Sequence, residues 1–191
     1  MKKNKDKFII VGVFITVLLV GIWLGNNTQD DQTDIELPND RTILIYFTES
    51  DINKDYLDTY NQIVNYLSLT LEDNGYRVVV GSDLEYQEYE LLIYVTIDEN
   101  LDGVITYYQN TIDGSGILAG LVQDYTSTKT YAKNLGIEIK ELNLGNKVSC
   151  QLNLGLINLN SEHYLRDEKY IESIALAITN GINEYFEGQI V

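Results

Sequence analysis

Residues 91–97 read LLIYVTI, an apolar run that decides the fold class of this chain. Residues 42–47, TILIYF, form a second run of the same kind. Unbroken runs of β-branched, aromatic and aliphatic residues predict strands that are buried on both faces, as in parallel sheets. Shorter apolar segments predict three further strands, at residues 77–80, 137–144 and 148–154.

Between these strands the apolar residues recur every three or four positions, which is the spacing of an amphipathic helix. This pattern predicts one helix over residues 56–73, ended by Asn74-Gly75, and a closing helix over residues 170–186. A third helix is expected within residues 116–134. Because strands alternate with helices, we expect an α/β fold, a mostly parallel sheet with helices on both faces.

The first residues have a different character and predict one N-terminal transmembrane helix. Residues 1–7 are basic and are expected to be a cytoplasmic tail, and residues 8–25 are expected to be an uncleaved single-pass anchor. A cleaved signal peptide is the alternative, but the end of the apolar run lacks a small-x-small cleavage site. Residues 26–40 predict an acidic disordered linker, and residues 41–191 predict an extracytoplasmic domain. The expected location is the cell membrane.

Charge and composition exclude several classes of function. The 191 residues carry 13 Lys and Arg against 29 Asp and Glu, a net charge of −16, which argues against a nucleic-acid partner. The single cysteine, Cys150, cannot form an intramolecular disulfide and is expected to be a small buried hydrophobic residue. The single histidine, His163, cannot supply a zinc site that needs several histidines.

The C-terminal part of the sequence resembles a known family of cell-wall hydrolases. Residues 151–158, QLNLGLIN, precede a segment at 174–186 that reads IALAITNGINEYF. This order is similar to zinc-dependent N-acetylmuramoyl-L-alanine amidases, in which Leu-x-Glu-x-Gly-Phe-Ile-Ser-Asn precedes a helix finishing in Ile-Ala-x-Ala-Ile-x-x-Gly-Ile-x-x-Tyr. Residues 91–100 resemble the family's strand leading into Ser-Ile-His-Ala-Asn, and residues 67–80 resemble its Leu-x-x-x-Leu-x-x-x-Gly-x-x-Val segment. The resemblance spans about residues 41–187 and implies an amidase-like fold.

The resemblance also implies that the catalytic site is degenerate. Family members hold Zn²⁺ with His, Glu and His, and a further Glu activates the bound water for cleavage of the lactyl–peptide amide of peptidoglycan. The first His position corresponds to Glu49, the second to Asp98, and the catalytic Glu to Asn153. An amide side chain cannot act as a general base. We therefore expect no catalytic residue and no zinc ligand at these positions, and His163 matches no ligand position.

A second interpretation keeps a metal but changes its kind. Glu49, Asp98 and one of Asp55 or Asp58 would form a carboxylate cluster, which suits Ca²⁺ or Mg²⁺ better than zinc. Residues 98–103, DENLDG, also match the first half of a calcium loop, D-x-N-x-D-G, although a turn rich in Asp, Asn and Gly is the ordinary alternative. The candidate calcium or magnesium ligands are Glu49, Asp98, Asn100 and Asp102.

The expected function is that of a membrane-anchored binding or regulatory module in bacterial peptidoglycan remodelling, with sporulation and division as candidate processes. Its expected partner is peptidoglycan or another cell-wall protein, such as an active hydrolase, and no cofactor is expected apart from the calcium or magnesium alternative. A divergent active amidase with a rearranged carboxylate-metal site is the alternative. The excess of carboxylates favours a basic protein surface over an anionic glycan as partner.

Overall fold

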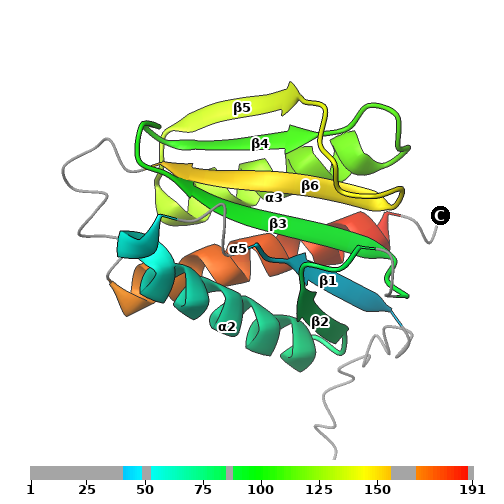
Figure 1. The fold of residues 1–191 in the computed structure, drawn as a ribbon, viewed down its shortest axis with the longest axis horizontal. Helices are drawn as coiled ribbons and strands as arrows, with labels where there is room; N and C mark the ends of the chain where they lie inside the picture. The colour runs from blue at the N-terminus through cyan, green and yellow to red at the C-terminus, as the bar shows by residue number, and fades with distance from the viewer. Residues whose placement is uncertain (1–40, 49–52, 85–87, 156–166, 189–191) are drawn as a thin grey trace, which may run out of the picture. The chain divides into compact units, whose positions relative to one another are not determined.

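The computed structural model describes residues 41–48, 53–84, 88–155 and 167–188. Within them the chain forms one six-stranded sheet in the order β2-β1-β3-β6-β4-β5 (Figure 1). The strands are β1 (Thr42–Tyr46), β2 (Arg77–Gly81), β3 (Leu91–Asp98), β4 (Val104–Tyr108), β5 (Asn134–Ile139) and β6 (Val148–Gly155). The helices are the short 3-10 helix η2 (Lys54–Tyr56), α2 (Leu57–Asp73), α3 (Ser115–Thr130) and α5 (Glu168–Glu187).

The sheet is mixed and mostly parallel, which confirms the predicted α/β class. β1 pairs in parallel with β2 and β3, β3 pairs in parallel with β6, and β4 pairs in parallel with β5. β4 and β6 are antiparallel, so the last two strands in the order run against the other four. The sequence did not predict β4, whose five residues follow β3 after a short turn.

The central strands β1 and β3 are buried on both faces, as their unbroken apolar runs predict. Ile43, Ile45 and Ile93 have no exposed surface. Leu44 and Leu92 point to one face of the sheet, and because side chains alternate along a strand, the three isoleucines point to the other face, which the helices cover. α5 contributes a wide apolar face that includes Ile174 and Ile178. Each buried aliphatic side chain of this kind contributes roughly 1.5–3 kcal/mol of transfer free energy, so this layer forms the main core.

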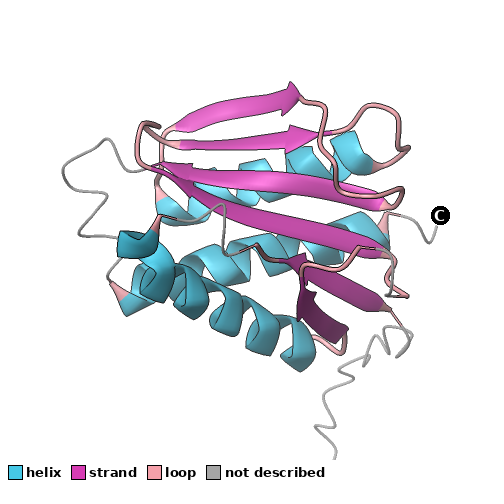
Figure 2. Ribbon diagram, in the orientation of Figure 1, coloured by secondary structure: helices cyan, strands magenta, loops and turns pink. Residues whose placement is uncertain are grey.

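The described helices cover one face of the sheet, and the predicted covering of both faces by helices is wrong for the described residues. α5 packs between α2 and α3, and α3 packs on β4, β5 and β6. Figure 2 shows α3 and α5 behind the sheet. Right-handed crossovers explain the arrangement. α2 connects β1 to β2, and α3 connects β4 to β5. The two connections lead toward opposite edges of the sheet, and their strands also run in opposite directions. Right-handed connections therefore place both helices on the same face.

Extended connections, instead of helices, cover part of the other face. The connection from β2 to β3, residues 82–90, is shorter than the roughly dozen residues that a crossover helix needs. Its Tyr89 packs with the sheet residues Leu44 and Leu92. Residues 140–147 between β5 and β6 add Leu142 and Leu144 to the same cluster, although the sequence predicted a strand through residue 144. The carboxyl ends of β3 and β6 extend beyond this cover.

None of the helices in the described ranges has the length and hydropathy needed to cross a membrane. The predicted anchor, residues 8–25, and the predicted linker, residues 26–40, lie outside the described residues, as do Glu49 and His163.

Candidate functional site

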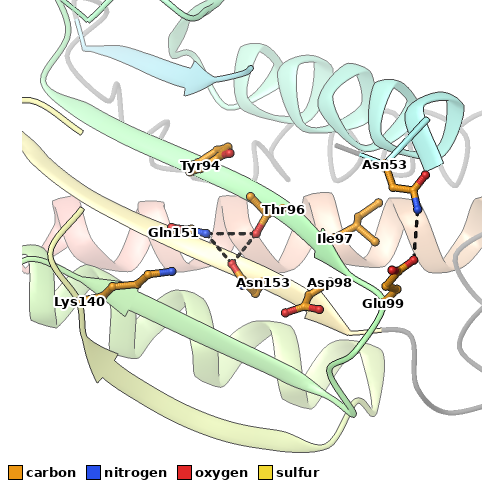
Figure 3. Close-up of a pocket in the computed structure, with 9 residues that line it drawn as sticks. All are labelled: Asn53, Tyr94, Thr96, Ile97, Asp98, Glu99, Lys140, Gln151 and Asn153. Carbon is orange, nitrogen blue, oxygen red and sulfur yellow. Dashed lines mark hydrogen bonds between the residues drawn. The ribbon is translucent and has the colours of Figure 1, made fainter. Parts of the chain in front are cut away.

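A polar pocket lies at the carboxyl ends of β3 and β6, on the face of the sheet opposite the helices (Figure 3). Its volume is about 460 Å³, within the range of small-molecule sites. In α/β sheets the carboxyl edge of parallel strands is where ligands bind. The pocket is lined by residues of β3, β6 and three neighbouring segments: Asn53, Tyr94, Thr96, Ile97, Asp98, Glu99, Lys140, Gln151 and Asn153.

The floor of the pocket is a network of uncharged polar side chains. The amide nitrogen Nε2 of Gln151 donates to Asn153 Oδ1 at 2.8 Å and to Thr96 Oγ1 at 3.3 Å. The Thr96 hydroxyl in turn forms a short hydrogen bond with Asn153 Oδ1. Parallel pairing places these three side chains together, because Thr96 is opposite Asn153 and Tyr94 is opposite Gln151. All three are more than nine-tenths buried, and their mutual hydrogen bonds hold the side chains against one another.

Charged groups stand at the rim of the pocket, and several of them already have partners. Asp98 Oδ1 accepts a hydrogen bond of 2.9 Å from the backbone N–H of Asn100, and Glu99 Oε2 accepts one of 3.2 Å from Asn53 Nδ2. Lys140 Nζ lies 4.6 Å from the centre of the Tyr107 ring, a cation–π contact. The rim therefore presents both signs of charge around a neutral floor.

Tyr107, on β4, lies near two carboxylates and contacts Lys140 of the rim. Burial raises the pKa of the Tyr107 phenol above its ordinary value, and the carboxylates of Glu138 and Asp98 raise it further.

Of the residues singled out from the sequence, Asp98 and Asn153 line this pocket together. Asp102 does not line the pocket, and its carboxylate oxygen Oδ2 pairs with Lys133 Nζ at 3.3 Å. Asp55 and Asp58 are exposed at the start of the helical segment after β1. Glu49 lies outside the described residues, so the proposed carboxylate cluster has no described member at that position.

The calcium-loop interpretation is not favoured by the strand that follows residues 98–103. The second half of a calcium loop must wrap around the ion, but here Val104 begins β4 and pairs with Leu154. Thr106, which would be the ninth position, is fully buried and donates to Gln123 Oε1 at 2.8 Å. In the described ranges no three His, Cys, Asp or Glu side chains gather closely enough to hold a metal ion.

Sequence reasoning missed Thr96 and Gln151, the two residues that hold Asn153. A signal for them was present, because each precedes a singled-out residue of the same strand by two positions. Side chains two apart in a strand point to the same face, so Thr96 accompanies Asp98 and Gln151 accompanies Asn153. Lys140 and Asn53 come from loops that meet the pocket only in the folded chain and carry no such signal.

The fold is that of an amidase-like α/β domain. Solved amidases share its architecture. The CwlD amidase from Clostridioides difficile, whose structure is a complex with the GerS lipoprotein, superposes with a TM-score of 0.67 at 18% identity, over 77% of this chain and 98% of that one. An N-acetylmuramoyl-L-alanine amidase from Clostridium difficile 630 gives 0.66 at 21% identity, over 78% and 98%. AmiC2 of Nostoc punctiforme gives 0.61 at 16% identity, over 77% and 97%.

These likenesses confirm at the level of the fold the amidase resemblance of the sequence. No protein-family model matches this chain, and neither does any curated protein. The shared architecture covers nearly the whole of each amidase structure, so this chain keeps the frame of the domain. The residues of the pocket, and not the frame, must decide what the domain does.

Proposed function

We propose that this chain is a membrane-anchored, extracytoplasmic module with a binding or regulatory role in bacterial peptidoglycan remodelling. We further propose that it does not cleave the amide bond that the amidases cleave. The observation that carries the proposal is the state of Asn153. The position that resembles the catalytic Glu of the amidases holds an amide, and its oxygen is occupied by Thr96 and Gln151.

The chemistry of amide hydrolysis supports this proposal. The reaction needs an activated water, which the amidases obtain from a zinc ion and a carboxylate base. Asn153 cannot accept a proton at neutral pH, and the chain has one histidine in all. The pocket is therefore equipped to hold a ligand rather than to attack one.

We propose that the partner is peptidoglycan or a cell-wall protein. The net charge of −16 favours a protein with a basic surface, because like charges repel an anionic wall polymer. The CwlD structure was solved with a lipoprotein, so a domain of this fold forms a complex with another protein. Sporulation and division are the processes in which we propose that this module acts, anchored through residues 8–25.

Co-sedimentation tests the binding function. The full-length chain, purified in a mild detergent, is mixed with purified peptidoglycan sacculi or with a wall-protein extract, and bound chain is measured after centrifugation or capture. We expect retention by one of the two, lowered by salt where the contact is electrostatic. Asn153→Glu is the informative variant, because it restores the carboxylate without restoring a metal site. Failure of the chain to bind either preparation would contradict the proposal.

A further inference from the structure

We propose that the pocket recognises an amide group of its ligand through the side chains of Asn153 and Gln151. This inference rests on the proposed function and names the chemistry of the ligand. It starts from the hydrogen-bonding capacity of the floor. An Asn or Gln side chain carries one carbonyl acceptor and two N–H donors, and a threonine hydroxyl can donate one hydrogen bond and accept others.

The internal network leaves one group of each amide unused. Asn153 uses its carbonyl oxygen, which accepts from both Thr96 and Gln151. Gln151 uses its nitrogen, which donates to Thr96 and Asn153. Among the described residues the nitrogen Nδ2 of Asn153 and the oxygen Oε1 of Gln151 form no hydrogen bond, although both side chains are more than nine-tenths buried. Neither atom belongs to the fully buried side-chain atoms that lack a partner, so both keep some accessible surface. Because both residues line the pocket, we infer that this surface faces it.

This donor–acceptor pair does not depend on which way the amides are turned. If both side-chain amides are rotated by half a turn, Asn153 donates to Gln151 and Thr96, and the Thr96 hydroxyl donates to Gln151. Gln151 then presents its nitrogen and Asn153 its oxygen. In either arrangement the floor offers the ligand one N–H donor and one carbonyl acceptor.

The ligand group that matches such a pair is uncharged and offers both a hydrogen-bond donor and an acceptor. A carboxylate leaves the acceptor of the floor without a donor, and an ammonium leaves the donor without an acceptor. Placing either charge on a neutral, nearly buried floor also costs desolvation free energy. A peptide bond or an acetamido group presents N–H and C=O together and leaves neither side unsatisfied. Both groups share this chemistry, and the experiment separates them.

Two pairs of probes test the inference on the full-length chain in detergent, with binding measured by isothermal titration. N-acetyl-L-alanine methylamide is compared with methyl O-acetyl-L-lactate, in which ester oxygens replace both N–H groups and both carbonyls remain. An oligomer of N-acetylglucosamine is compared with the matching glucose oligomer, in which a hydroxyl replaces the acetamido group. We expect the amide-bearing member of one pair to bind about tenfold more tightly than its analogue, the effect of one or two lost hydrogen bonds.

Variants locate this preference in the floor. Asn153→Leu and Gln151→Leu should abolish it, and Asn153→Asp, which keeps the shared acceptor but loses the N–H donor, should reduce it without disturbing the network. Asn61→Leu, a matched change of an exposed amide on α2, should leave it intact. Equal binding of amide and analogue in both pairs, or a preference that survives Asn153→Asp and Gln151→Leu, would overturn the inference. If the chain binds sacculi but shows no preference for the amide probes, this inference fails and the proposed function stands. If it prefers the amide probes and also cleaves the peptidoglycan amide, the proposed function fails and this inference stands.

Discussion

Gly155 holds the turn between β3 and β4 against the end of β6, and the change Gly155→Ala tests this packing. Its backbone N–H donates to Gly103 O at 2.8 Å. A Cβ at this position would lie 2.3 Å from Leu101 O and 2.5 Å from Gly103 O. Both atoms are backbone, so the turn must move away. Overpacking of this kind costs about 1–3 kcal/mol and the stretched hydrogen bond about 1 kcal/mol, a total of roughly 2–4 kcal/mol.

The assay is thermal unfolding followed by far-ultraviolet circular dichroism. For a chain of this length 1 kcal/mol corresponds to about 2–4 °C, so Gly155→Ala should lower Tm by roughly 5–15 °C. The matched control is Gly120→Ala on α3, where a Cβ meets nothing within 4 Å. That variant should gain about 1 kcal/mol of helix propensity and raise Tm by about 2–4 °C. A shift of Tm in the same direction for both variants would contradict this role of Gly155.

Three further outcomes follow from buried polar groups. Gln123→Leu removes hydrogen bonds to Thr106, to the carbonyl of Val104 and to Asn134. It should lower the free energy of unfolding, measured by urea titration, by about 2–4 kcal/mol. An unchanged free energy of unfolding would contradict the role of this amide. Burial raises the pKa of Tyr76 from 10.0 to about 12 in the folded chain, partly opposed by Arg41, so its stabilising contribution is complete below pH 10 and is lost as the pH rises toward 12. Tyr76→Phe should flatten that decline of unfolding free energy, and an unchanged pH profile would refute the assignment. The fully buried Cys150 thiol, whose pKa burial raises, should react with a thiol reagent only after unfolding, and rapid labelling of the native chain would contradict its placement.

The strands and helices with strong periodicity were predictable from the sequence, because each buries a continuous apolar surface. The predicted strand at residues 91–97 corresponds to β3, and the predicted helix at 56–73 corresponds to α2 with a 3-10 turn before it. The helix expected within residues 116–134 ends earlier, at Thr130, because Tyr131 adopts a left-handed conformation with φ of 55°. Such a conformation in a non-glycine residue leaves no mark in the periodicity.

The arrangement of the strands was less predictable. β4 is a short strand whose position beside β6 depends on pairing with residues far along the chain. Its antiparallel direction then places α3 on the same face as α2, and this outcome cannot be deduced from the alternation of strands and helices. The face without described helices follows from it, and that face carries the pocket.

The candidate site was predictable in part for the same reason. Asp98 and Asn153 were identified by their resemblance to amidase positions, and they line one pocket because β3 and β6 are adjacent and in parallel register. The network around Asn153 depends on cross-strand pairing, which joins Thr96 to Asn153 over a long stretch of sequence. The rim residue Lys140 reaches the pocket from a loop, so only the folded chain reveals it.

Release of stem peptide from purified sacculi shows directly whether the full-length chain hydrolyses the amide bond. The products are quantified by mass spectrometry, with zinc, calcium and magnesium added in separate reactions and an active amidase of this fold as the positive control. We expect the same amount of free peptide as in reactions without protein, because Asn153 cannot act as a base in any of these conditions. Peptide release that rises with the amount of chain, in the presence of any of the three metals, would contradict it.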